Sequence, residues 1–317
     1  MNPSKFSALL LGAGLCAPWP ARASTIAVSP APAAAPAPFD SICQSTANAA
    51  RTAARRDAQH EYWIAIAKCL NGPGYNSCRE EAEDALEEAL ELAQVQYGER
   101  LAVCSLLGQG AYNPAIDPDD FSATIDNSYL PFVPGRTLVY EKMTPDGLER
   151  VEVTTLAETV EINGVECRQV RDVVTLDGEF VEDTIDFYAQ DEDGNVLYFG
   201  EVVQNFEDGF LDNLDGSWRY GKDGAKPGIV MLGDPDPNDA YRAEFLVGEA
   251  EDIIKVLSVG QAVQVGARTF QNCVKTKDWT PLEPDKFEHK FYAPGIGLVM
   301  EFDPEHNERL ELVQIID

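Results

Sequence analysis

Carboxylate-rich turns are the first places in this sequence where side chains could do chemistry. In the segment 191–195, DEDGN, oxygen-bearing side chains stand at alternate positions, as they do at the opening of a calcium-binding loop. Such a loop has its glycine at the sixth position and a glutamate at the twelfth, where Val202 stands here. Asp191, Asp193 and Asn195 are therefore the candidate metal ligands, with Ca²⁺ as the possible cofactor. A polar hairpin turn is the alternative interpretation.

Aromatic side chains form a second set of candidates. In a curled sheet, alternate residues of each strand face inward, so these rings could line a cavity for an apolar or amphipathic ligand. They could equally fill a solid core, and the sequence alone does not distinguish a cavity from a core. The candidate ligand-binding residues are Phe187, Tyr198, Trp218, Tyr241, Trp279 and Tyr292.

No complete catalytic motif occurs in the chain. A G-x-S-x-G element is absent, and Ser217 with His289 and Asp186 is the nearest combination to a hydrolytic triad. His60-Glu61 lacks the second histidine of a zinc-protease motif. A hydrolase acting through paired carboxylates stays an alternative, because sequence spacing cannot establish their separation. The sequence thus favours a protein that is not an enzyme, with no catalytic residue assigned.

The charge balance restricts the partners. The chain has 54 Asp and Glu residues against 24 Lys and Arg, a formal net charge of −30. Nucleic acid and anionic membrane surfaces are repelled by such a charge. A small-molecule or lipid-like ligand is the expected partner, and cation binding by the acidic surface is the second possibility.

The first residues predict export. Lys5, the apolar run 6–15 and the small residues Ala21 and Ala23 are typical of a signal peptide covering residues 1–23. Cys16 lies within it, but Leu15 stands where lipidation requires a small residue. Residues 24–38 form a Pro/Ala linker that cannot bury a core. We expect a secreted or periplasmic protein without a membrane span.

Residues 39–108 predict an antiparallel helical hairpin clamped by disulfides. Cys43 and Cys69 are 26 residues apart, as are Cys78 and Cys104, and the helix-breaking segment Asn71-Gly72-Pro73-Gly74 lies between the inner pair. Residues equidistant from the turn face each other in a hairpin. We therefore expect the bonds Cys69–Cys78 beside the turn and Cys43–Cys104 at the open end.

Each predicted helix has an apolar stripe. In the second helix, residues 86, 90, 93, 97, 101 and 104 recur at steps of three and four. The first helix offers a weaker stripe that includes Ile42, Trp63 and Leu70. The hairpin could serve as a spacer or as a docking surface for a protein partner.

Residues 109–317 predict an acidic antiparallel β domain closed as a half-barrel or barrel. Asp-Gly and Asn-Gly turns separate short runs rich in Val, Thr, Phe and Tyr. Cys167 and Cys273 lie in two such runs, and we expect them to bond to each other in an exported protein. The expected strands cover residues 136–143, 150–162, 165–176, 179–190, 195–204, 217–220, 241–247, 253–257, 268–279, 286–292, 298–303 and 309–316.

Several blocks of the β domain resemble a family of exported bacterial proteins of uncharacterised function. They are IDNSYLPFVPG at 125–135, YAQDEDGNVLYFGE at 188–201, WTPLEP at 279–284 and EHKFYAPGIGLV at 288–299. The resemblance covers about 200 residues of the sequence. It implies export and brings no activity, ligand or catalytic residue.

These observations predict an α+β protein in two parts. The leading hypothesis is an exported, non-enzymatic binding protein that holds a small apolar or amphipathic ligand in its β domain. The alternatives are an acidic calcium-binding protein and a carboxylate-dependent secreted hydrolase.

Overall fold

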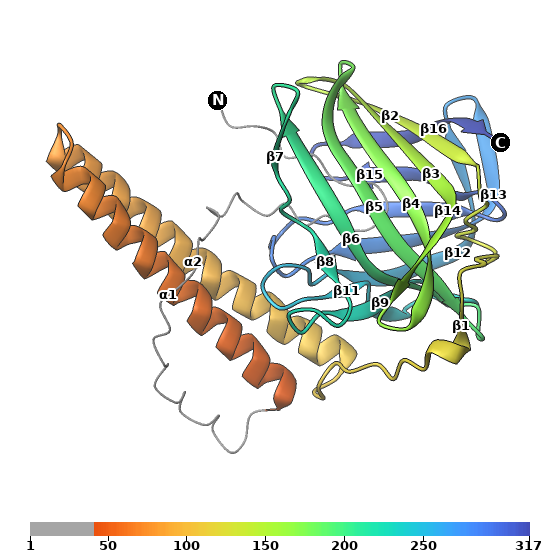
Figure 1. The fold of residues 1–317 in the computed structure, drawn as a ribbon, viewed down its shortest axis with the longest axis horizontal. Coiled ribbons are helices and arrows are strands. Elements are labelled where there is room, and N and C mark those ends of the chain that lie inside the picture. The colour runs from red at the N-terminus through yellow and green to blue at the C-terminus, as the bar shows by residue number, and fades with distance from the viewer. Residues whose placement is uncertain (1–40) are drawn as a thin grey trace. The chain divides into compact units, whose positions relative to one another are not determined.

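The computed structural model describes residues 41–317. The described chain divides into two compact units between Tyr112 and Asn113. The first unit is a helical hairpin and the second is a nearly closed antiparallel β barrel (Figure 1). This confirms the predicted α+β fold class. The predicted signal peptide and the whole of the predicted Pro/Ala linker lie outside the described residues.

The hairpin consists of α1 (Ile42–Leu70) and α2 (Tyr75–Leu107). Ser41 begins α1 with a capping box, in which its Oγ accepts from Gln44 N at 3.1 Å and its own N–H donates to Gln44 Oε1 at 3.1 Å. Among residues 41–317, no helix is both long and apolar enough to cross a membrane.

Small side chains form the contact between α1 and α2. Ala47 of α1 and Ala82 and Ala93 of α2 are buried, and the Arg51 guanidinium lies 3.9 Å from the centre of the Tyr97 ring. The predicted stripe on α2 is correct, since its members are buried or half-buried. The predicted stripe on α1 is wrong: Trp63, with 66 % of its surface exposed, faces outward, because alanines rather than large residues occupy the seam.

Both disulfides of the hairpin are confirmed. Cys43 is bonded to Cys104 with a Cα–Cα distance of 5.8 Å, and Cys69 to Cys78 with one of 5.6 Å. Disulfides persist in oxidising compartments, so this pairing indicates a protein that works outside the cytoplasm.

The barrel is an antiparallel meander with the strand order β10-β12-β13-β14-β15-β16-β2-β3-β4-β5-β6-β9-β11, and β1, β7 and β8 pair with β5 or β6. The bounds are η1 Pro118–Asp120, β1 Phe121–Ser122, β2 Thr137–Thr144, β3 Gly147–Ile162, β4 Val165–Leu176, β5 Glu179–Asp191, β6 Val196–Glu207, β7 Phe210–Asn213, β8 Trp218–Arg219, β9 Lys226–Met231, β10 Ala240–Arg242, β11 Glu244–Phe245, β12 Ile253–Val265, β13 Arg268–Trp279, β14 His289–Ala293, β15 Gly297–Asp303 and β16 Glu308–Ile316.

A single short segment joins the two ends of this sheet. Its first half, β10, pairs with β12, and its second half, β11, pairs with β9. Only Ala243 separates the two halves, so residues 240–245 act as one bent strand that bridges the gap. These ladders are three and two residues long, which makes the closing segment the weakest part of the wall.

An irregular segment before β2 fills part of the barrel interior. Ile125 forms an isolated bridge with Phe132, and Leu130 and Phe132 belong to the buried core. The Asn127 side chain holds this segment in place: its Nδ2 donates to the carbonyls of Gly194 and Leu232, and its Oδ1 accepts from the N–H groups of Tyr129 and Leu130. The 125–135 block of the sequence thus forms an internal plug.

The predicted bond between Cys167 and Cys273 is wrong. Both are free, buried thiols. Cys167 lies on β4 and Cys273 on β13, with five strands between them along the sheet. Their side chains also belong to different apolar clusters. Sequence composition suggested a pair, but the topology places the two residues on opposite sides of the barrel.

Gly228 of β9 lies against the closing segment. A β-carbon at this position would collide with the backbone carbonyl of Ala243. We predict that Gly228→Ala destabilises the barrel by about 3 kcal/mol, because the two backbones must separate. Gly224→Ala is the control, since its left-handed φ of +88° has open space around it and should cost only about 1 kcal/mol. Denaturant unfolding followed by near-ultraviolet circular dichroism measures both, and equal losses would contradict the close contact.

Candidate functional site

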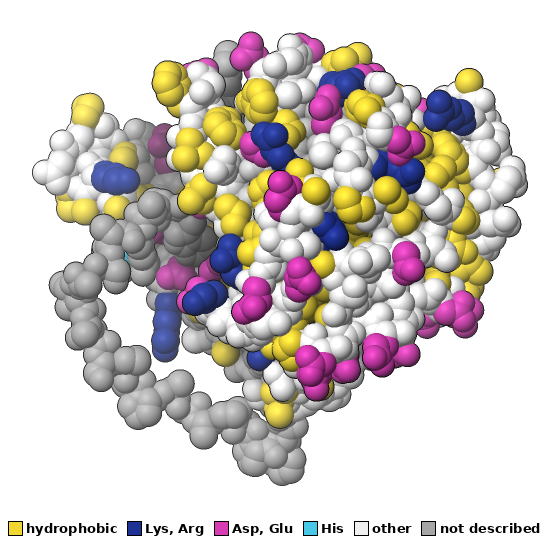
Figure 2. Space-filling view, turned by 45° about the vertical axis from the view of Figure 1, so that its right-hand side comes forward, with side chains coloured by type: hydrophobic (Ala, Val, Ile, Leu, Met, Phe, Trp, Pro, Cys, Tyr) yellow, Lys and Arg dark blue, Asp and Glu magenta, His cyan; other side chains and the backbone are white. Residues whose placement is uncertain are grey.

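The outer surface and the interior of the barrel differ in how they carry charge. Figure 2 shows acidic and basic side chains scattered over one face of the barrel with apolar side chains between them. The interior, in contrast, holds a run of stacked aromatic rings and a group of buried carboxyls. These two features together form the candidate site.

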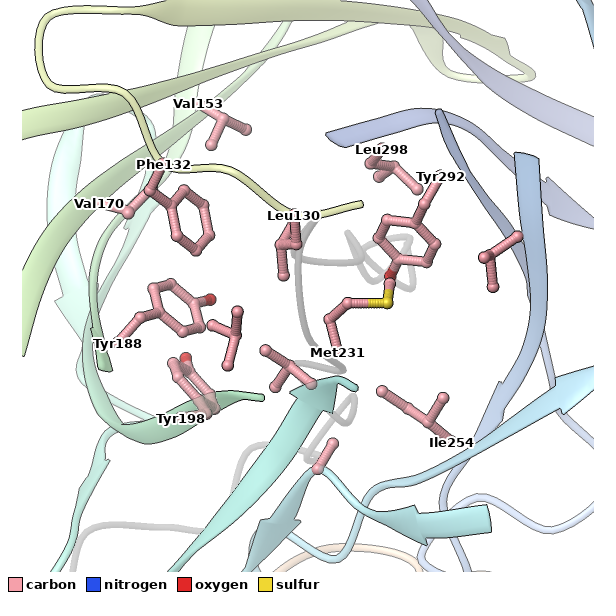
Figure 3. Packing of buried hydrophobic residues seen from close by; sticks show 14 of the residues in the cluster. Leu130, Phe132, Val153, Val170, Tyr188, Tyr198, Met231, Ile254, Tyr292 and Leu298 are labelled. Atoms are coloured by element: carbon pink, nitrogen blue, oxygen red, sulfur yellow. The ribbon is translucent and has the colours of Figure 1, made fainter. Parts of the chain in front are cut away.

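Four aromatic rings follow one another inside the barrel, from Phe132 of the plug to Tyr188, Tyr198 and Trp218 of the wall. Phe132 stacks on Tyr188 with ring centres 4.7 Å apart, and Tyr188 stacks on Tyr198 at 4.8 Å. Tyr198 in turn meets Trp218 edge to face at 5.3 Å. In Figure 3, Tyr188 and Tyr198 point inward from one wall, while Tyr292 points inward from the opposite wall.

Four carboxyl groups lie buried beside these rings. Asp186 comes from β5, Glu201 from β6, Glu244 from β11 and Asp252 from the residue before β12. Asp186 and Glu201 are direct cross-strand partners. Like charges in that arrangement repel each other, so at least one of the two must be neutral for the pair to be tolerated.

A β-bulge in β6 brings a ring and a carboxyl to the same face. The register shifts between the pairs Phe187–Gly200 and Tyr188–Tyr198, so that Tyr198 and Glu201 can both face the interior. Gly200 makes this possible with a φ of +131°, and a β-carbon there would collide with the backbone of Trp218. The bulge therefore also brings Trp218 close to the site.

The hydrogen bonding of the site is incomplete. Tyr198 donates its hydroxyl to Asp186 Oδ1 at 2.6 Å. Within the described chain, neither oxygen of Glu244 makes a hydrogen bond of good geometry, although the Trp218 indole acts on it as a donor and lowers its pKa. Glu201 Oε2 and Asp252 Oδ1 have no hydrogen-bond partner among the described residues. Leaving such buried polar atoms unpaired costs about 1–3 kcal/mol each.

Burial raises the pKa of all four carboxyls. It brings the pKa of Asp186 to about 7, although the Tyr198 hydroxyl acts in the opposite direction, and it brings that of Asp252 to about 7. The pKa values of Glu201 and Glu244 are raised well above the usual range, first by burial and then by the neighbouring carboxyls. The site is therefore largely protonated in mildly acidic solution.

A second group of carboxyls in the barrel has its own cation. Lys290 is only 1 % exposed, and its ammonium lies 3.6 Å from Asp278, 3.6 Å from Glu301 and 3.9 Å from Glu288. These charges balance one another in part, and Lys290 also lowers the pKa of Asp252. For Glu201, the strongest charges acting on it are the carboxyls of Asp186 and Glu182.

The structure brings some of the predicted aromatic candidates together and separates others. Tyr198 and Trp218 are in contact, and Tyr241 and Tyr292 belong to the same buried core. Phe187 packs in a different cluster, with Arg219 over its ring at 5.3 Å. Trp279 is half-buried, with the Lys277 ammonium 5.3 Å from its ring centre.

The predicted calcium ligands form a hydrogen-bonded turn. Asp191 Oδ1 accepts from the Asn195 N–H and Oδ2 accepts from Asn195 Nδ2, both at 2.8 Å, while Asn195 Oδ1 accepts from the Gly233 N–H at 3.0 Å. Asp193 is exposed. No group of three or more His, Cys, Asp or Glu side chains in the part of the chain that the structure describes is arranged to hold a metal ion. Calcium binding at these residues stays a prediction.

The three residues nearest to a hydrolytic triad, Ser217, His289 and Asp186, make other contacts. Ser217 Oγ lies 2.9 Å from the backbone N of Val203 and 3.3 Å from its carbonyl oxygen. Asp186 accepts from Tyr198, and the His289 ring stacks against Phe302. None of these contacts links Ser217, His289 and Asp186 into a catalytic relay.

Glu201 and Glu244 are site residues that the sequence did not reveal. A signal was present in β5, where Asp186 stands between Ile185 and Phe187 in a run that is apolar on both faces. An acidic residue within such a run has no solvent-facing side to occupy. Glu201 gives the same signal, since it stands between Gly200 and Val202 in the apolar run 196–203, whereas no such run surrounds Glu244.

Comparisons with known proteins leave the family open. No family model matches the chain, and no curated protein matches its sequence. Among solved structures, a crystallised "putative lipoprotein" from Parabacteroides distasonis is similar, with 14 % identity and a TM-score of 0.32. The match covers 60 % of this chain and 99 % of that one. So low a similarity carries no argument about function.

The raised pKa values predict that the barrel is more stable in acid. Because the folded pKa of Asp186 and Asp252 exceeds the unfolded value of about 4, the folded state binds more protons between about pH 4 and 7. Stability must therefore fall as pH rises through this window, by about 1.4 kcal/mol per pH unit for each titrating group.

The variant Glu201→Gln tests directly whether the buried carboxyls cause this pH dependence of stability. The amide is neutral at every pH, so the variant should be more stable than the wild type near pH 7.5 and should lose less stability between about pH 5 and 7.5. Glu161→Gln removes one exposed charge and should keep the wild-type slope. Denaturant unfolding across this pH range provides the measurement. A wild-type slope in Glu201→Gln would show that surface repulsion, rather than the site, causes the pH dependence.

Proposed function

We propose that this protein is an exported, non-enzymatic binding protein that holds a small amphipathic ligand inside its barrel. The hairpin disulfides support the compartment. Ligand sites in proteins are mostly apolar with a few convergent polar groups. The barrel interior has this composition, with an aromatic wall that ends at Tyr198 and Trp218 and carboxyl groups beside it.

One observation carries the proposal. Glu244 is completely buried, and among the described residues neither of its carboxyl oxygens makes a hydrogen bond of good geometry. The Trp218 indole is the one hydrogen-bond donor among the groups that shift its pKa. A core built only for stability gains nothing from such a group, because a buried polar atom without a partner is destabilising. A binding site gains from it, since poorly paired carboxyl oxygens favour a ligand that can pair with them.

The closing segment offers a route into the filled interior. The closing segment carries Glu244, and the turn that follows it ends at Asp252, so residues 240–252 hold two of the four carboxyls. The ladders of the closing segment to β9 and β12 are short. Displacing this segment breaks few backbone hydrogen bonds, whereas displacing β3 or β4 would break many. Movement of the closing segment would open the barrel wall directly beside the buried carboxyls.

A crosslink across the closing segment tests this proposal. Lys226 and Phe245 are register partners on β9 and β11, so Lys226→Cys/Phe245→Cys can be oxidised to hold the barrel shut. The matched control is Lys226→Ser/Phe245→Ser, which cannot be crosslinked. The probes are three amphiphiles with the same decyl chain length: decanoate, decyl glucoside and decyltrimethylammonium.

We expect at least one probe to bind once per chain to the serine control in native mass spectrometry. The oxidised cysteine variant should bind it at least about tenfold more weakly, because the ligand cannot enter. Failure of all three probes to bind, or equal affinity for the crosslinked and control proteins, would contradict binding inside the barrel.

A further inference from the structure

The charges around the candidate site are unbalanced. Glu244 is acted on by Asp252, Glu201 and Asp186, and Glu201 by Asp186, Glu182 and Asp252. These groups come from β5, β6, β11 and the start of β12, so acidic side chains approach the site from each of these elements. The other titratable groups that act on these four carboxyls or their tyrosine neighbours are Asp172, Tyr188, Tyr198, Asp278, Glu288 and Lys290.

The Lys290 cluster shows what this barrel uses to satisfy buried carboxyls. There an ammonium group lies among Asp278, Glu288 and Glu301 at 3.6 to 3.9 Å, fully withdrawn from solvent. A cation among several carboxylates gains Coulomb energy that grows as the surroundings become less polar. Glu201 Oε2 has no hydrogen-bond partner among the described residues, and Glu244 has only the Trp218 indole as a donor. Both carboxyls therefore favour a cation of the same kind from outside the chain.

The aromatic rings favour an organic cation over a metal ion. Tyr198 donates to Asp186, and the Trp218 indole acts on Glu244, so both rings border the carboxyls. The face of an aromatic ring attracts a weakly hydrated ammonium group. A metal ion would instead require several oxygen ligands converging at about 2.0–2.6 Å. No such group of acidic side chains occurs in the described chain.

We propose that the ligand class is an amphipathic organic ammonium ion, held by Glu201, Glu244 and Asp252 with the rings of Tyr198 and Trp218, and that its binding expels a proton. This inference rests on the proposed function and names the ligand for that same site. The charges balance, because the ligand brings one positive charge while one carboxylic acid of the site releases its proton to solvent. No bond to the ligand forms and nothing is oxidised or reduced.

Decyltrimethylammonium is the decisive probe because its charge is fixed at every pH. Titration calorimetry in two buffers with different ionisation enthalpies gives the number of protons released. We expect release approaching one proton per ligand near pH 6, and an affinity that rises up to about tenfold per pH unit below pH 7. Decyl glucoside should bind at least about tenfold more weakly than the cation.

Two variants connect this effect to the site. Glu244→Gln keeps the shape of the side chain and should lower the affinity for the cation about tenfold or more. Asp252→Asn should lower the same affinity independently. Glu161→Gln changes the net charge equally from an exposed position and should stay within about twofold of the wild type. Thermal unfolding of each variant identifies any that fails to fold.

The outcomes separate the two proposals. If decyl glucoside binds as tightly as the cation, and the crosslink still blocks it, the binding function stands and the cationic ligand class is overturned. If Glu161→Gln weakens binding as much as Glu244→Gln, the long-range field of the acidic surface explains the preference and the site assignment fails. If no probe binds, both proposals fail.

Discussion

The barrel has to accommodate carboxyl groups in a place that water does not reach. Asp186 and Glu201 stand opposite each other on neighbouring strands, and Glu244 of the closing segment and Asp252, just before β12, lie close to them. Two ionised carboxylates cannot share such a site, so the structure depends on protons held there. This constraint connects stability, barrel closure and the proposed ligand class.

Backbone geometry creates the constraint as much as side-chain chemistry does. The bulge at Gly200 turns Glu201 inward beside Tyr198, and the bend at Ala243 lets one short segment pair with both β9 and β12. Gly228 permits that segment to approach closely enough to close the wall. The same contacts that close the barrel therefore also bury its poorly paired carboxyls, so a change in either should alter the other.

Local patterns predicted much of the fold. The mirror-symmetric cysteines gave both hairpin disulfides, and Asp-Gly and Asn-Gly turns located most long strands within a few residues. Strand β9 was missed because Pro227 and Gly228 are poor strand formers, and here they serve at the end of the sheet where it closes. The bond between Cys167 and Cys273 was wrong because composition says nothing of which strands are neighbours.

The candidate site was predictable only in part for the same reason. Tyr198 and Trp218 were recognised as ring residues, whereas Glu201 and Glu244 looked like ordinary members of an acidic surface. The burial of Glu201 follows from a bulge, and that of Glu244 from closure by a two-residue strand. The closure depends on the pairing of β11 with β9, which no local pattern records.

The protonation of the buried carboxyls is the central claim, and infrared spectroscopy measures it directly. At about pH 6, the protein should show carbonyl stretching bands of protonated carboxylic acids, and Glu201→Gln and Glu244→Gln should each remove or shift part of that absorption. Glu161→Gln should leave it unchanged. A spectrum at this pH with ionised carboxylates alone would contradict the account.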